Sequence, residues 1–96
     1  MQKPEITIEY CPKCGWLLRS AYLAQELLTT FEEELVKVSL VPSEIGGNFE
    51  IKLNENVIFN RKTAGRFPEV KELKTLVRDL IAPERNLGHI DRANQR

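Results

Sequence analysis

The sequence predicts an α/β fold in which a four-stranded mixed sheet carries two helices, in the order β-α-β-β-β-α. Three observations lead to this prediction. Hydrophobic and polar residues alternate over residues 5–10 and again after residue 48, which is the period of a half-buried strand. Two longer segments instead repeat their hydrophobic residues every three or four positions, as amphipathic helices do. A strand, a helix and a second strand in succession make a parallel pair with a right-handed crossover.

Length and composition limit the kind of protein. Ninety-six residues make one domain, with a core expected over about 5–82 and a polar tail over 83–96. The chain is 42% hydrophobic and 29% charged, as ordinary globular proteins are. Fourteen basic residues balance fourteen acidic ones, so we expect neither nucleic acid nor a membrane as a partner. Because the N-terminus has no signal-peptide pattern and no hydrophobic run approaches about 20 residues, we expect a cytoplasmic location.

The first strand and the first helix lie on either side of the two cysteines. Residues 5–10 predict the strand, and residues 15–34 predict a helix of about five turns. The hydrophobic face predicted for this helix consists of Leu17, Ala21, Ala24, Leu28, Phe31 and Leu35. Tyr22 and Phe31 are both expected in the core because they recur at helical spacing.

Short strands and a final helix make up the second half of the chain. The predicted elements are a strand over 35–41, a loop over 43–48, hairpin strands over 49–53 and 57–59 with a turn over 54–56, a polar loop over 60–67 and a helix over 68–81. Pro68 suits the first position of this helix, and Pro83 ends it. Its predicted buried face consists of Val70, Leu73, Val77, Leu80 and Ile81. A parallel β-α-β unit followed by a hairpin and a helix is the thioredoxin-like plan.

Cys11 and Cys14 are separated by two residues, between a predicted strand and a predicted helix, which is where a thiol–disulfide site is expected. The N–H groups and the positive potential of a helix N-terminus favour a thiolate over a thiol. One thiolate attacks, and the second thiol resolves the mixed disulfide. Pro12 stiffens the turn between the two sulfurs, and Lys13 adds positive charge beside them. This pattern is compatible with an oxidoreductase and with a redox sensor.

Two alternative functions fit the same residues. Cys-Pro-x-Cys-Gly is also the knuckle of zinc ribbons, but a structural zinc needs four ligands, and His89 is the one further nitrogen or sulfur ligand of the usual kind. We therefore expect no metal and no cofactor. The domain could instead be a non-catalytic protein-interaction module, because a fold does not determine a function.

Several motifs besides the cysteine pair carry a family resemblance. They are Tyr-Cys-Pro-Lys-Cys at 10–14, Gly-Gly-x-Phe-Glu at 46–50, Gly-Arg-Phe-Pro-Glu at 65–69, Leu-Lys at 73–74, Arg-Asp at 78–79 and Leu-Gly-His at 87–89. In their order and spacing the chain resembles the Rdx family, the group of selenoproteins W, T and H, and in particular its short bacterial members. The resemblance covers about residues 5–91. It implies a thioredoxin-like fold and a thiol-based redox role, with glutathione or protein thiols as partners.

The two cysteines are given different roles by two lines of reasoning. The usual logic of a Cys-x-x-Cys pair favours Cys11 as the attacking and more exposed sulfur, whereas the resemblance places Cys14 where vertebrate selenoprotein W carries selenocysteine. We favour Cys11 as the attacking residue of a working couple. Thioredoxins also place a cis-proline opposite the disulfide, and no proline directly precedes Phe49 here. The candidates for that surface are Gly46, Gly47 and Asn48.

Aromatic and basic residues near the motifs receive mainly structural interpretations. Trp16 is expected to fix the first turn of the helix, with shielding of the disulfide as the alternative. Phe67 is expected to pack against the last helix. Arg61, Lys62 and Arg66 are expected in a solvated loop, and a glutathione carboxylate is the ligand that they would otherwise attract.

Overall fold

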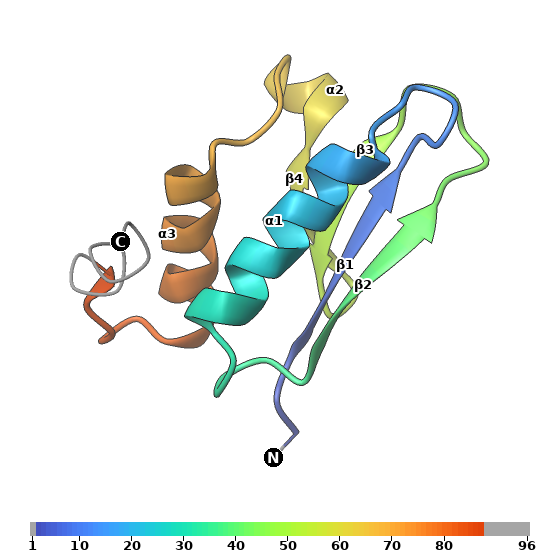
Figure 1. Ribbon diagram of the computed structural model, residues 1–96. Coiled ribbons are helices and arrows are strands. Elements are labelled where there is room, and N and C mark those ends of the chain that lie inside the picture. Colours follow the sequence, from blue (N-terminus) through green and yellow to red (C-terminus); the bar gives the residue numbers. More distant parts are fainter. Residues whose placement is uncertain (1, 88–96) are drawn as a thin grey trace.

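The computed structural model describes residues 2–87, which form a sheet covered by helices (Figure 1). Its elements are β1 (Glu5–Tyr10), α1 (Leu17–Thr30), β2 (Lys37–Pro42), β3 (Phe49–Leu53), β4 (Asn56–Asn60), α2 (Arg61–Ala64) and α3 (Val70–Ile81). The strands form one sheet in the order β2-β1-β3-β4, in which β1 is parallel to β2 and antiparallel to β3. The predicted α/β class with a mixed four-stranded sheet is therefore confirmed.

The hydrophobic core lies between the sheet and the two longer helices. Ile8 pairs with Ile51, and Tyr10 pairs with Phe49, so the buried side chains of β1 and β3 stand on the same face of the sheet. α1 and α3 lie side by side (Figure 1), and their buried side chains join those of the sheet in one cluster. Burying each such large side chain stabilises the fold by roughly 1.5–3 kcal/mol. Leu87, which the sequence placed in the polar tail, also belongs to this core.

The first helix is shorter than predicted, and its predicted hydrophobic face is only partly right. Ala24, Phe31 and Leu35 are buried as predicted, whereas Leu17 and Leu28 are exposed. α1 ends at Thr30 because the chain turns at Phe31, whose carbonyl accepts a hydrogen bond from the Leu35 N–H at 2.9 Å. Its buried residues are Ser20, Leu23, Ala24, Leu27 and Thr30. Polar residues on the buried face explain the error, since the Ser20 hydroxyl satisfies itself by donating to the Trp16 carbonyl at 2.8 Å. Tyr22 is 53% exposed, so its predicted place in the core is wrong.

Two strand boundaries differ from the predicted ones. β2 begins two residues late, at Lys37, because the Val36 N–H donates to the carbonyl of Pro4 before the strand starts. Pro42 is accommodated inside β2, which is an edge strand. The hairpin turn has two residues instead of three, since Asn56 already pairs with Leu53.

Residues 60–67 contain a short helix where a polar loop was predicted. The Asn60 side chain accepts a hydrogen bond from the Thr63 N–H at 3.2 Å and so starts α2. Gly65 ends α2 with a φ of 76°, in the left-handed region that glycine adopts at little cost. Asn60 as the N-cap residue and Gly65 as the C-cap residue are therefore the sequence signal for this helix.

The last helix begins at Val70, two residues after the predicted start. Glu69 is its N-cap residue, and the side chains of Glu69 and Glu72 each accept a hydrogen bond from the other residue's backbone N–H. Leu80, predicted on the buried face, is 52% exposed. Lys74 is buried there instead, because its ammonium group binds the Glu26 carboxylate of α1 at 3.0 Å.

The capping contacts of α3 predict how stability depends on pH. Hydrogen bonds from Arg66 and from the backbone of Glu69 lower the pKa of Glu72 from 4.5 to about 2. A carboxylate with a lowered pKa stabilises the folded state above its unfolded pKa and loses this effect as the pH falls through its folded pKa. We expect the free energy of unfolding of the wild type to fall more between pH 5 and pH 2 than that of Glu72→Gln.

The measurement is urea denaturation at each pH, and the expected difference is small because both side chains are exposed and screened by solvent. Glu55→Gln, an exposed glutamate of the hairpin turn, is the matched control and should behave as the wild type. If Glu72→Gln also follows the wild type at every pH, the capping interaction has no measurable effect.

Candidate disulfide site

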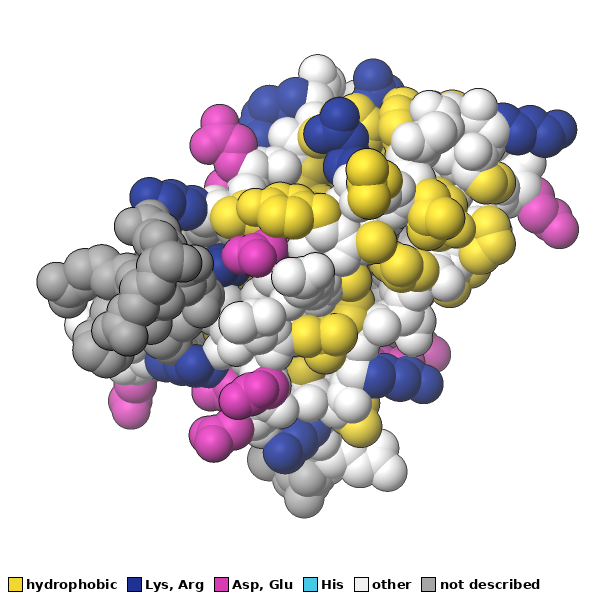
Figure 2. Space-filling model, in the orientation of Figure 1, with side chains coloured by type: hydrophobic (Ala, Val, Ile, Leu, Met, Phe, Trp, Pro, Cys, Tyr) yellow, Lys and Arg dark blue, Asp and Glu magenta, His cyan; other side chains and the backbone are white. Residues whose placement is uncertain are grey.

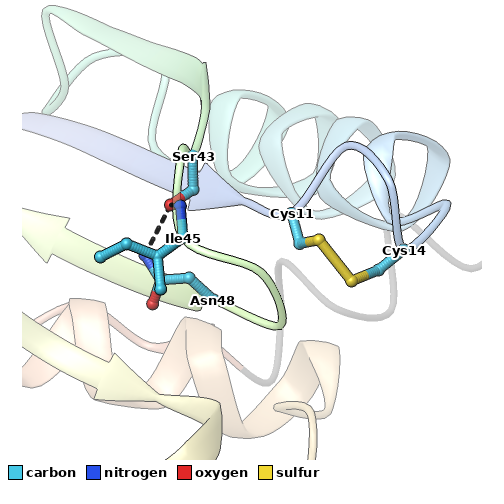
Figure 3. Close-up of a disulfide and its surroundings, with 5 residues drawn as sticks. All are labelled: Cys11, Cys14, Ser43, Ile45 and Asn48. Atoms are coloured by element: carbon cyan, nitrogen blue, oxygen red, sulfur yellow. Dashed lines mark hydrogen bonds between the residues drawn. A yellow bond between two sulfur atoms is a disulfide. The ribbon is translucent and has the colours of Figure 1, made fainter.

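Cys11 and Cys14 form a disulfide at the carboxyl end of β1 (Figure 3). Their Cα atoms are 5.4 Å apart, because residues 12–15 form a tight turn that brings the chain back beside the end of the strand. The Gly15 N–H donates to the Pro12 carbonyl at 3.2 Å and closes this turn. Gly15 has a φ of 76°, so any other residue would strain the turn.

The two sulfur-bearing residues differ in exposure. Cys11 is 2% exposed, whereas Cys14 is exposed. The expectation that Cys11 is the more accessible sulfur is therefore wrong. The physical reason is that Cys11 directly follows the central strand of the sheet, while Cys14 lies on the outer side of the turn. Pro12 and Lys13, between them, are exposed.

The relation of the cysteines to the helix also differs from the prediction. α1 begins at Leu17, so Cys11 lies six residues before the first helical residue and Cys14 lies three before it. The potential of a helix N-terminus falls off within about one turn, which leaves it little effect at Cys11. Cys14, three residues before the first helical residue, is therefore the cysteine whose thiolate the helix N-terminus can stabilise.

The loop between β2 and β3 (residues 43–48) is fastened beside Cys11 by a polar network. The Ser43 N–H donates to the Tyr10 carbonyl at 2.7 Å, directly before Cys11. The Glu9 carboxylate accepts from the Ser43 hydroxyl at 2.8 Å and from the Asn48 amide at 2.9 Å. The same amide donates to the Ser43 hydroxyl at 3.1 Å (Figure 3). Ser43 and Asn48 are both 8% exposed, so these polar groups depend on one another for hydrogen bonds.

Gly46 and Gly47 occupy the middle of this loop. Gly47 has a φ of 76°, and a Cβ atom added to it would lie 4.0 Å from Cε of Lys62. The structure therefore brings the predicted glycine pair to the same end of the sheet as the disulfide and α2. A Cβ atom added to Gly46 or Gly15 would meet nothing within 4 Å, so close packing against a neighbouring group does not require glycine at either position.

Three aromatic rings pack together at the start of α1. The ring centroids of Trp16 and Phe67 are 4.9 Å apart, those of Phe49 and Phe67 are 5.1 Å apart, and all pairs meet edge to face. This geometry is favourable because the edge of one ring faces the electron-rich surface of the next. Trp16 thus fixes the beginning of α1 against β3, as predicted, and Phe67 packs on Trp16 and Phe49.

Two arginines stack on this cluster. The guanidinium of Arg19 lies 4.0 Å from the centroid of Phe67, and that of Arg61 lies 4.9 Å from Trp16 and 5.0 Å from Phe67. Arg61 was predicted in a solvated loop, and this part of the prediction is wrong because α2 turns its side chain onto the rings. Arg66 instead binds Glu72 through both terminal guanidinium nitrogens, at 2.7 and 2.5 Å.

A shallow hollow beside the disulfide was not predicted. It is lined by Gly15, Trp16, Leu18, Arg19 and Tyr22. Leu18 is 82% exposed, and Tyr22 lies four residues later on the same side of α1. Figure 2 shows hydrophobic side chains gathered over the first half of α1, with Lys and Arg side chains above them. Leu18 lies outside the hydrophobic face that the helical period predicts, and a large hydrophobic residue on the other side of the helix was the sequence signal for this hollow.

The family of the chain follows from comparison with known proteins. The model of the Rdx family matches residues 5–79, which include both cysteines, the glycine loop and most of α3. The chain belongs to the Rdx family. The predicted membership is thereby confirmed.

Bacterial structures in this fold are similar to the chain over most of its length. A selenoprotein W-related protein from Vibrio cholerae is 54% identical to the chain and superposes on it with a TM-score of 0.79. The match covers 82% of this chain and 98% of the Vibrio cholerae chain. A protein from Bordetella parapertussis is 49% identical, with a TM-score of 0.80. This match covers 83% of the present chain and 100% of the Bordetella chain.

The Rdx chain is also similar to curated mammalian proteins. Migration and invasion enhancer 1 is 35% identical in Mus musculus and 33% in Bos taurus over a 75-residue alignment, and the match covers 76% of this chain. The match spans 61% of the length of these relatives.

Residues 2–87 contain no group of three or more His, Cys, Asp or Glu side chains placed to hold a metal ion. His89, the further zinc ligand considered above, lies outside the described residues. No helix in the same range is long and hydrophobic enough to cross a bilayer.

The polar network predicts a large effect of one substitution. Asn48→Ala removes both amide hydrogen bonds and leaves Glu9 and Ser43 with fewer partners in a mostly buried site. We expect the free energy of unfolding to fall by about 1–3 kcal/mol, as measured by urea denaturation of the oxidised protein.

Gln25→Ala is the matched control, because Gln25 is an exposed side-chain amide on α1, and we expect a change within about 0.5 kcal/mol. Equal stability of the two variants would mean that the network does not hold the loop.

Proposed function

We propose that the protein is a thiol–disulfide redox protein that exchanges disulfides with its partners through Cys14. The observation that carries the proposal is the pair itself, in which one bonded sulfur belongs to a buried residue and the other to an exposed one. Membership of the Rdx family and similarity to a selenoprotein W-related protein support a redox role.

Reduction of the disulfide proceeds by two exchange steps. A partner thiolate attacks the Cys14 sulfur, the bond to Cys11 breaks, and Cys11 leaves as a thiolate that takes up a proton. A second partner thiolate then attacks the partner's sulfur in the mixed disulfide and releases Cys14 as a thiolate. Two partner thiols are oxidised to one disulfide, and the protein gains the two electrons.

The reverse reaction assigns complementary roles to the two residues. The Cys14 thiolate attacks a partner disulfide, and Cys11 resolves the mixed disulfide because the turn keeps the Cα atoms 5.4 Å apart. Lys13, directly before Cys14 in the turn, supplies positive charge beside the reacting thiolate. Burial keeps Cys11 away from partner molecules, which suits a resolving thiol that meets only the mixed disulfide at Cys14.

The partners that we propose are glutathione and protein thiols, and the location that we propose is the reducing cytoplasm, where such thiols are plentiful. Gly46 and Gly47 are proposed to flank the partner's backbone, because their loop lies beside Cys11 and Gly46 is exposed.

Single cysteine variants test this assignment. With glutathione disulfide, Cys11→Ser should bind one glutathione at Cys14, whereas Cys14→Ser should react at least about tenfold more slowly, because Cys11 is buried. Mass spectrometry of the intact protein follows the reaction, and the wild type should lose and regain two hydrogens in a glutathione redox titration.

If neither variant forms a mixed disulfide with glutathione, the proposed disulfide exchange is ruled out. Stoichiometric zinc bound by the reduced wild type would favour the knuckle alternative, and partner binding that survives replacement of both cysteines would favour an interaction module.

A further inference from the structure

Several cations near the disulfide have no acidic partner. Within residues 2–87, the Lys and Arg side chains in ion pairs are Lys37, Arg66, Lys74, Arg78 and Arg85. Lys13, Arg19, Arg61 and Lys62 form no ion pair with any described carboxylate. These four residues belong to the turn of the disulfide, the first half of α1 and α2. The positive charge of these four side chains is therefore not neutralised by a described carboxylate.

The two arginines are held in place although neither forms an ion pair within residues 2–87. Arg19 stacks on Phe67, and Arg61 stacks on Trp16 and Phe67, so the planes of both guanidinium groups are fixed by rings of the core. A guanidinium that is already ordered loses less side-chain entropy when it binds a carboxylate than a free one does.

Hydrophobic side chains lie next to these cations. Leu18 and Tyr22 are 82% and 53% exposed and stand four residues apart, so they form one strip along α1. Leu18, Tyr22, Trp16 and Arg19 line the hollow that begins at Gly15, the residue after Cys14. Neighbouring large hydrophobic side chains left open to solvent beside a reactive group are typical of an interaction surface.

We propose that this surface, formed by Trp16, Leu18, Arg19, Tyr22 and Arg61 and called here the α1 surface, binds an acidic segment of a partner protein. The segment places a bulky hydrophobic side chain in the hollow and a carboxylate beside Arg19 or Arg61, while its cysteine exchanges with Cys14. The inference rests on the proposed function and specifies its substrate class.

The hollow decides between a protein segment and glutathione. Glutathione has carboxylates that could bind the arginines, but it has no bulky hydrophobic side chain to cover Leu18 and Tyr22. A protein segment supplies both groups next to one cysteine. Charge complementarity requires the segment to be acidic, because the cations of the α1 surface lack carboxylate partners within the described residues.

Exchange rates with short peptides test the inference. The oxidised wild type is mixed with glutathione or with one of three cysteine peptides of equal length, whose flanking residues are Leu and Glu, Leu and Lys, or Ser and Glu. Acid quenching and mass spectrometry follow the mixed disulfide. We expect the Leu–Glu peptide to react about tenfold faster than the Leu–Lys peptide and about threefold faster than the Ser–Glu peptide, with the charge advantage shrinking at about 1 M salt.

Matched variants locate the effect. Arg19→Glu should remove most of the advantage of Glu over Lys, and Leu18→Ser should remove the advantage of Leu over Ser, with Tyr22→Ser as a second hydrophobic variant. Because Leu18 is 82% exposed, its replacement leaves the core intact. Lys71→Glu and Leu80→Ser are the controls, since both residues are exposed on α3, and they should keep the wild-type preferences.

The outcomes separate the two levels of the proposal. If the wild type reacts with all four thiols at rates within about twofold of one another, or if the α3 controls change the preferences as much as the α1 variants, the α1 surface does not select partners and the redox function stands. If no thiol reacts with the wild type, both proposals are wrong.

Discussion

The site depends on one constraint: β1 is paired with β2 on one side and with β3 on the other, up to its last residue. Tyr10 lies opposite Pro42 of β2 and Phe49 of β3, and its carbonyl accepts a hydrogen bond from the Ser43 N–H. The backbone is therefore fixed on both sides directly before Cys11. Since Cys11 cannot move outward, the tight turn that follows is what exposes the second sulfur. The difference between a buried and an accessible cysteine is thus a consequence of strand order.

The aromatic cluster links this strand end to the cationic surface. Phe49 begins β3, Trp16 precedes α1, and Phe67 lies between α2 and α3, so three separate segments meet at one point. The arginines stacked there keep their charge near the disulfide without neutralising it. The same rings that complete the core therefore also orient the groups that would receive a partner, which couples stability to recognition.

The sequence predicted most of the strand pattern and less of the site. Alternation identified β1 and β3 because one face of each is buried, and the cysteine motif located the disulfide. Ala24 was predicted on the buried face of α1, but Ser20 was not, because its hydroxyl is satisfied within the helix. The exposure of the two cysteines was also missed, since it depends on the pairing of β1 with two strands that come later in the chain. Such contacts join residues far apart in the chain, and local periodicity contains no information about them.

The most direct test of the account is the rate at which each thiol of the fully reduced wild type is alkylated. Brief treatment with iodoacetamide at neutral pH, followed by peptide mapping, reports the label at each cysteine separately. The account predicts that Cys14 is labelled at least about tenfold faster than Cys11, because Cys11 is buried at the end of the central strand. Equal labelling, or faster labelling of Cys11, would contradict it.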